Sequence, residues 1–253
     1  MRMALSQQKS FGIIFLGAVA VLAVWSGLTY TGIVSPIFLP SPTKVGASMI
    51  QLIISGKFFI ALMYSFARIA TATALAALVG IPLGILVGFS RTFERFTFII
   101  FEPMRYVPIS ALLPLMILWF GIGEQMKIMF LFIGIIFYLI PLIANAVHNI
   151  KKEYLLVADD LGLSAQETVR RVVWPAILPH IWDSIIVVNG LGWTYVVLAE
   201  MINAKEGLGY LISISGRLQR SSDVFAGLLF ITIVALISDR LLRFFRNKYF
   251  SWS

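Results

Sequence analysis

The stretch that decides the fold runs from Leu155 to Ile181 and reads LLVADDLGLSAQETVRRVVWPAILPHI. It forms most of the longest polar insertion, residues 148–181, in a chain of 253 residues that otherwise consists mainly of apolar runs. Gly162 is well placed to end a helix that begins near Leu155. Ser164 followed by Glu167 has the spacing of a capping box, which starts another helix. We therefore expect two short helices with a glycine corner between them.

Two prolines mark the end of this insertion. Pro175 is predicted to stop the second short helix, and Pro179 is predicted to precede the next apolar run. One interpretation is an interfacial amphipathic helix that lies on the bilayer surface. The other is a stiff docking surface for a soluble partner, and the residues alone leave both interpretations open.

The composition of the whole chain is typical of an integral membrane protein. Hydrophobic residues make up 59% of it and charged residues 13%, against roughly 45–50% and about 25% in soluble proteins. So few charges could not cover the surface of a soluble domain of this size. The chain has no Cys, which excludes disulfides, Cys-ligated zinc, iron–sulfur clusters and a cysteine nucleophile. The net charge of +8 is spread between the apolar runs, unlike the dense basic patch that nucleic acid requires.

A transmembrane helix needs about 20 mostly apolar residues. By this measure the chain is an all-α integral membrane protein with a single transmembrane domain, residues 1–253. Its apolar runs predict about six spans, at 11–33, 64–89, 97–120, 127–147, 182–202 and 223–243. A cleaved signal peptide is the weaker alternative for the first span, because the apolar run continues well past the small residues at Ala18–Ala20.

The distribution of Lys and Arg predicts the orientation of these spans. With the N-terminus inside, twelve of them fall in cytoplasmic segments and six in external segments. This excess predicts that both termini and the insertion 148–181 are cytoplasmic. The remaining two, Arg68 and Arg105, fall within or at the edge of the spans.

The insertion resembles the EAA loop of the membrane subunits of ABC importers. In that family the pattern is E-A-A, three residues, G, nine residues, I, any residue, L and P. The matching positions here are Leu156–Ala158, Gly162, Val172, Trp174 and Pro175. The sequence departs from the pattern at Leu156, where the family often has Glu, and at Trp174, where it often has Leu. The glycine corner is retained.

Further matches extend the resemblance over nearly the whole chain and indicate the nitrate/sulfonate/taurine branch of these permeases. They are Leu39–Pro42, Ser65–Arg68, Gly80–Gly84, Pro114-Leu115, Trp119–Glu124 with Lys127, Ala199–Met201 and Gly207–Tyr210. Their order and spacing are more specific than any one of them. The resemblance implies the architecture of a type I ABC importer permease in the cell inner membrane.

The resemblance also implies partners. Two copies of the chain would form the pore, each docking its coupling loop onto a cytoplasmic ATP-binding subunit, while a periplasmic or lipid-anchored binding protein delivers the substrate. The chain has no P-loop (G-x-x-x-x-G-K-[ST]), so ATP and Mg are expected on the partner subunit and no cofactor on this chain, which is not itself an enzyme. The residues expected to dock the ATPase are Ala158, Asp159, Gly162, Leu163, Ser164, Ala165, Thr168, Arg171 and Pro175.

Several residues inside the spans are candidates for the translocation pathway or its gate, because embedded ionisable groups are functional by default. Arg68 is expected to extend toward the outer surface as a snorkelling side chain. Arg105 either pairs with Glu102 or faces the pathway and steers an anionic substrate. Pro108 and Pro114 are expected to kink the third span, so that it lines the pathway.

The fifth span carries polar and aromatic candidates of its own. Asn189, Trp193 and Tyr195 either line the conduit or pack between helices. Glu200, at the outer end, either belongs to the gate or pins the loop that follows, and pinning is slightly favoured. No cluster at metal-ligand spacing includes either of the two histidines, His148 and His180.

The expected function is the import of a small anion or zwitterion, such as nitrate, bicarbonate, a sulfonate or taurine, by alternating access. The main alternative is a self-sufficient secondary carrier or channel, which predicts inverted repeats or paired acidic residues deep in the bilayer. A membrane-embedded enzyme would need a constellation of His, Asp or Ser within the spans. The sequence shows neither pattern. Gly80, Gly84 and Gly88 form a small-residue stripe that predicts close helix packing.

Overall fold

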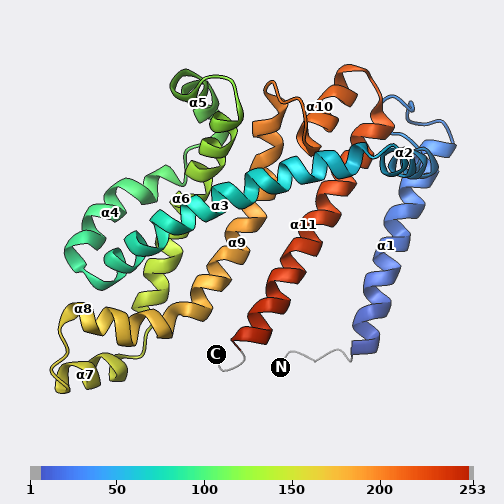
Figure 1. Cartoon of the computed structure of the whole chain (residues 1–253). Coiled ribbons are helices and arrows are strands. Elements are labelled where there is room, and N and C mark those ends of the chain that lie inside the picture. The colour runs from blue at the N-terminus through green and yellow to red at the C-terminus, as the bar shows by residue number, and fades with distance from the viewer. Residues whose placement is uncertain (1–6, 251–253) are drawn as a thin grey trace.

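The computed structural model describes residues 7–250, and the regular structure within them is entirely helical (Figure 1). The long helices are α1 (Gln7–Tyr30), α3 (Lys57–Phe89), α6 (Glu124–His148), α9 (Trp174–Met201) and α11 (Ser221–Tyr249). The shorter elements are α2 (Pro42–Ile54), α4 (Arg91–Met104), η1 (Ile109–Leu112), α5 (Leu113–Phe120), α7 (Lys152–Asp160), α8 (Ala165–Thr168), η2 (Val169–Val173) and α10 (Leu208–Arg217).

Four helical segments among the described residues are long and apolar enough to cross a membrane: α3, α6, α11 and the continuous segment Ala165–Met201 that contains α9. Two shorter apolar helices, Phe15–Tyr30 and Ile109–Phe120, lie within the regions expected to hold the first and third spans. An integral membrane protein built only from helices is the fold class that the sequence predicts.

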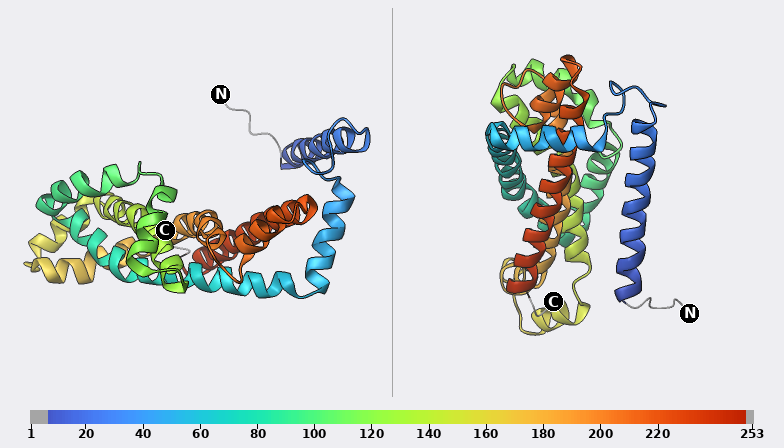
Figure 2. Two further views of the ribbon diagram at one scale, coloured as in Figure 1. Left: turned by 90° about the horizontal axis from the view of Figure 1, so that it is seen from above. Right: turned by 90° about the vertical axis from the view of Figure 1, so that its right-hand side faces the viewer.

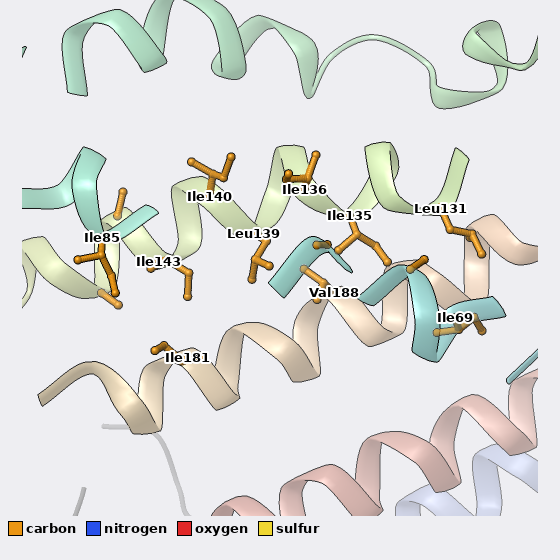
Figure 3. Packing of buried hydrophobic residues seen from close by; sticks show 14 of the residues in the cluster. Ile69, Ile85, Leu131, Ile135, Ile136, Leu139, Ile140, Ile143, Ile181 and Val188 are labelled. Atoms are coloured by element: carbon orange, nitrogen blue, oxygen red, sulfur yellow. The ribbon is translucent and has the colours of Figure 1, made fainter. Parts of the chain in front are cut away.

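The core lies where α3, α6 and α9 pack against one another, and α3 against α6 is the most extensive contact of the fold. Figure 3 shows isoleucine, leucine and valine side chains of these helices meeting in it. The predicted glycine stripe faces α6. A Cβ at Gly84 would lie 2.6 Å from Cβ of Ile143, and one at Gly88 would lie 2.6 Å from Cβ of Val147. Only glycine permits this close approach, which strengthens dispersion contacts between helices in lipid.

Helix α1 stands apart from this bundle and meets it mainly through α2 (Figure 2). The indole Nε1 of Trp25 donates a hydrogen bond of 2.9 Å to the carbonyl of Pro40. The same indole stacks against the ring of Phe225 in α11, with 6.2 Å between ring centroids. These contacts fix the C-terminal end of α1, while most of its described side chains remain exposed.

The expected third span, 97–120, is not one kinked helix. Helix α4 ends at Met104, and after a turn the chain begins again with η1 and α5. Pro108 is the N-cap of η1, and Pro114 lies in the first turn of α5. A proline at a helix start removes no intrahelical hydrogen bond, because that N–H would have no partner there. The two prolines therefore separate helices, and the prediction of a kink was wrong.

Most of the short helices lie at the two ends of the bundle. Helices α2, α5 and α10 lie at one end, and α7 and α8 lie at the other, together with the start of α1 and the end of α11 (Figures 1 and 2). We call the first the outer end and the second the loop end. Ser41 before Pro42 is a recognisable start signal for α2 that the prediction of spans overlooked.

Candidate functional site

The loop at the loop end contains the predicted glycine corner. Gly162 has φ +68, in the left-handed region that glycine adopts without steric cost. The N–H of Leu163 donates to the carbonyl of Ala158 at 3.0 Å, and the N–H of Gly162 donates to the carbonyl of Asp159 at 2.9 Å. These two bonds form a Schellman motif, which ends α7 and sets the direction of the chain.

The predicted capping box is also present and begins α8. The N–H of Glu167 donates to the hydroxyl of Ser164 at 3.4 Å, and the N–H of Ser164 donates to the carboxylate of Glu167 at 3.1 Å. The Ser164 hydroxyl, 2.8 Å from the same carboxylate, lowers the pKa of Glu167, so that the carboxylate remains charged to lower pH. Both sides of the corner are therefore fixed by hydrogen bonds.

Burial divides the residues of this loop into two sets. Ala158, Thr168 and Val173 are buried and hold α7 against the helix that follows. Several apolar side chains point outward instead, among them Leu156 with 61% of its surface exposed and Leu161 with 72%. Of the other predicted docking residues, Leu163 is half-buried, and the exposed ones are Asp159, Gly162, Ser164, Ala165, Arg171 and Pro175.

Pro175 does not stop the second loop helix, so that prediction was wrong. The helix continues from Ala165 to Met201, and a π-helical turn, Val169–Val173, ends two residues before Pro175. A proline cannot donate the hydrogen bond to the carbonyl four residues earlier. The wider turn accommodates this lost bond without a break, as π-bulges commonly do. The loop is thus joined to a membrane helix by one continuous helix.

An ionic network, made of Arg68, Glu124, Lys127, Glu200 and Ser65, lies at the outer end. Glu124 is exposed, and the other four residues are buried. The guanidinium of Arg68 donates to Glu124 through Nε at 2.6 Å and Nη2 at 2.7 Å, and to Glu200 through Nη1 at 2.6 Å. The ammonium of Lys127 donates to Glu124 at 2.8 Å. Two cations and two carboxylates make the cluster neutral, which lowers the cost of burying Arg68, Lys127 and Glu200.

Arg68 is therefore not a snorkelling residue, since only 3% of its surface is exposed. The expectation was wrong because its partners come from distant parts of the chain. Sequence reasoning also missed Ser65, Glu124 and Lys127 as members of the network. The position of Arg68 within the apolar run of α3 was the one sequence feature that could have indicated a buried ion pair.

Glu200 is fully buried and fixes the chain that follows α9. Its carboxylate accepts a hydrogen bond from the N–H of Gly209 at 2.8 Å and lies 2.8 Å from the hydroxyl of Ser65. That hydroxyl accepts a further bond from the N–H of Leu208 at 2.9 Å. Glu200 thus joins α9 to the first turn of α10, the arrangement expected of a pinning residue.

Two of the polar candidates in α9 make packing contacts. The amide of Asn189 donates to the hydroxyl of Ser238 in α11 at 3.0 Å. The Trp193 side chain is buried in the core. Tyr195 differs from both, because it lies beside Gly134 and lines a small cavity together with Arg105.

Arg105 lies at the end of α4, with its guanidinium carbon 5.1 Å from the centre of the Tyr138 ring in α6. Among the described side chains no carboxylate pairs with it within 4.0 Å. The predicted partner Glu102 has a side chain that lies outside the described residues. Neither histidine joins a metal-ligand cluster in the described part of the chain. His148 lies 3.6 Å from Glu94.

Comparison with known proteins places this architecture in a family. Residues 80–251 match the family model of the binding-protein-dependent transport system inner membrane component. The taurine transport system permease protein TauC of Escherichia coli (strain K12) is 33% identical over 99% of this chain and 92% of its own length. The putative aliphatic sulfonates transport permease protein SsuC of Bacillus subtilis (strain 168) is 31% identical over 92% and 84%.

The fold is also similar to a solved structure. A chain of the MetNI methionine ABC transporter in an inward-facing conformation superposes with a TM-score of 0.66 at 19% identity, over 79% of this chain and 95% of that one. At this identity the likeness concerns the fold. Together with the matches along the sequence, it shows that this chain belongs to the binding-protein-dependent transport system inner membrane components, the permease subunits of ABC importers.

Proposed function

We propose that this permease couples transport to ATP hydrolysis through the segment 152–173, which we call the coupling loop. The observation that carries the proposal is the combination of a corner fixed by hydrogen bonds with exposed apolar side chains at the loop end. The ATP-binding subunit would supply ATP and Mg, while this chain would bind no cofactor of its own.

The exposed leucines of the coupling loop suit a protein partner. Leu156 and Leu161 leave large apolar surfaces in water, and covering such a side chain is worth about 1.5–3 kcal/mol. The corner at Gly162 presents these side chains as a compact projection. A cleft on the ATP-binding subunit that accepts this projection would bury both leucines and contact the exposed residues around the corner.

The continuous helix from Ala165 to Met201 gives the coupling loop a mechanical role. Movement of the loop would be carried along this helix to its outer end, where Glu200 joins it to α10 and Arg68. Closure of the ATPase dimer would draw two such loops together and open the pathway outward. This is alternating access by a rigid element, and it needs no titratable group deep in the bundle.

A second copy of the chain is proposed to complete the pathway. Helices α4 and α5 carry many exposed apolar residues and contact the rest of the bundle sparsely. A homodimer would cover this face with the same face of the partner, as a two-fold interface requires. The membrane subunits would then present two coupling loops to two ATP-binding subunits.

The orientation and the external partner follow from the same arrangement. The start of α1 and the end of α11 lie at the loop end, which supports cytoplasmic termini (Figure 1). A binding protein would then deliver the substrate at the outer end. Because the relatives named above are permeases for taurine and for aliphatic sulfonates, we propose a small anion or zwitterion as substrate.

Co-purification tests the coupling. Tagged chain extracted in detergent should bring down an ATP-binding protein at about one copy per permease, with ATPase activity. Leu161→Asp should lower the recovery of that protein roughly tenfold or more, because it removes apolar burial and places a charge in the contact. Leu218→Asp is the matched control, since Leu218 also follows a short helix and is exposed, but lies at the outer end.

A permease that purifies alone and moves solute in vesicles without ATP would contradict the proposal. The secondary carrier would then be the better account. Equal losses from Leu161→Asp and Leu218→Asp would also contradict the assigned docking surface, because the outer end should not contact the ATPase.

A further inference from the structure

We propose that Arg105, with the polar side chains around it, forms a site that selects small oxyanions and sulfonates halfway through the bundle. The inference rests on the proposed function, because it assumes that the face carrying Arg105 lines the translocation pathway. It adds a residue-level basis for the class of substrate, which the coupling loop does not determine.

The Arg105 side chain is exposed, and it lies near the middle of the bundle's length. Its guanidinium lies over the ring of Tyr138, which is near the middle of α6 (Glu124–His148). Charged groups at such a depth typically face a water-filled cavity and mark the path of an ion or substrate. The chain between α4 and η1 is non-helical at this level, which is tolerated within a membrane only where the backbone meets protein or water.

Two cavities meet at Arg105. One has a volume of about 170 Å³ and is lined by residues that include Thr97 and Asn145. The other is smaller and is lined by Tyr138 and Tyr195. Arg105 lines both, and its guanidinium is thus accessible from two sides.

The side chains of these cavities supply hydrogen-bond donors. The guanidinium presents a planar fork of N–H groups that matches two oxygens of a sulfonate or nitrate. Further donors are the Thr97 hydroxyl and the Asn145 amide in the larger cavity, and the hydroxyl groups of Tyr138 and Tyr195 in the smaller one. The Tyr138 ring orients the guanidinium through cation–π attraction without neutralising its charge.

Arg105 and Arg68 differ in their surroundings among the described side chains. Arg68 is buried and held by two carboxylates. The described side chains offer Arg105 no carboxylate within ion-pair distance, and its own side chain is exposed. An anion that passes would compensate the charge, yet a single cation holds it weakly enough to release it, as conduction requires.

Charge-selective labelling tests this site, and the Cys-free chain gives a clean background. Val107→Cys places a thiol in the same cavity as Arg105. Its rate of modification is measured with two methanethiosulfonate reagents, one with a sulfonate group and one with a trimethylammonium group. The complex with its ATPase is used throughout, with Arg105→Gln as the test variant. Arg95→Gln is the control, since Arg95 is an exposed arginine of α4, the helix that ends just before Arg105.

Arg105→Gln should lower the ratio of sulfonate to trimethylammonium labelling by at least about threefold, the effect of one nearby charge even in water. Arg95→Gln should leave the ratio unchanged. Sodium methanesulfonate should slow labelling by the sulfonate reagent in the chain with Arg105, while sodium gluconate at equal concentration should not.

A ratio unchanged by Arg105→Gln, or an absence of protection by methanesulfonate, would overturn the proposed anion site. Co-purification of the ATPase is scored on the same samples. Its loss from every sample, including the chain with Arg105, would instead count against the proposed coupling and so remove the premise of the site. The two failures are therefore distinguishable.

Discussion

Replacing Glu200 by alanine should lower the free energy of unfolding by about 3–5 kcal/mol, the usual cost of removing one partner from a buried ion pair. The side chain is fully buried, and its carboxylate serves Arg68, Ser65 and the N–H of Gly209 at once. Arg68 would keep Glu124, but the Gly209 N–H would be left buried without an acceptor. Titration with sodium dodecyl sulfate in mixed micelles, followed by tryptophan fluorescence, measures the change.

Asp239→Asn is the control for this experiment. Asp239 pairs with Arg243 one turn away on the surface of α11, with 2.7 Å between the nearest atoms. Exposed pairs of this kind contribute little to stability, because water and salt screen them. If Glu200→Ala lowers the free energy of unfolding no more than Asp239→Asn does, the ionic network does not hold α9, α10 and α3 together.

Gly162→Pro should abolish recovery of the ATP-binding protein while the membrane helices remain folded. Proline fixes φ near −65°, whereas Gly162 has φ +68, so the corner cannot form. The substitution also removes the hydrogen bond from the Gly162 N–H to the carbonyl of Asp159. Pull-down with the tagged chain measures recovery, and the unfolding titration in the same detergent reports the folding of the bundle.

Gly162→Asn separates geometry from side-chain identity. Asparagine adopts the left-handed region more readily than other residues with a Cβ, and a Cβ at this position meets no atom within 4 Å. Recovery of the ATPase should therefore be largely retained. Full recovery with Gly162→Pro would refute the view that the corner presents the docking surface.

The coupling loop could be predicted from sequence because its structure is local. The Schellman glycine and the Ser164–Glu167 capping box each involve residues within about one or two helical turns. The glycine stripe of α3 could be recognised for a similar reason, because its period is that of one helix face. The helix against which this stripe packs depends on the tertiary structure, and only the structure identifies it as α6.

The ion pairs of Arg68 in the ionic network could not be predicted, because the partners are remote in sequence. Arg68 is 56 residues from Glu124 and 132 residues from Glu200. A helix pattern shows that Arg68 interrupts an apolar run, but it does not show what faces the guanidinium. Snorkelling was then the reasonable expectation, and burial against two carboxylates replaced it.

The prolines failed as predictors for a different reason. Proline excludes one backbone hydrogen bond, and the fold can respond by kinking, by starting a new helix or by widening a turn. Pro114 lies in the first turn of a new helix, and Pro175 follows a π-helical turn. Residue type alone does not select among these responses, since the packing of neighbouring helices decides the outcome.

In the proposed mechanism, ATP binding moves the coupling loops of two permease copies together. The most direct test uses Gln166→Cys, an exposed position in α8, with a spin label in the assembled complex. The distance between the two labels should shorten when ATP is trapped on the ATPase, while labels at Leu218→Cys at the outer end should move apart. Distances at Gln166 that do not change with ATP would contradict the account.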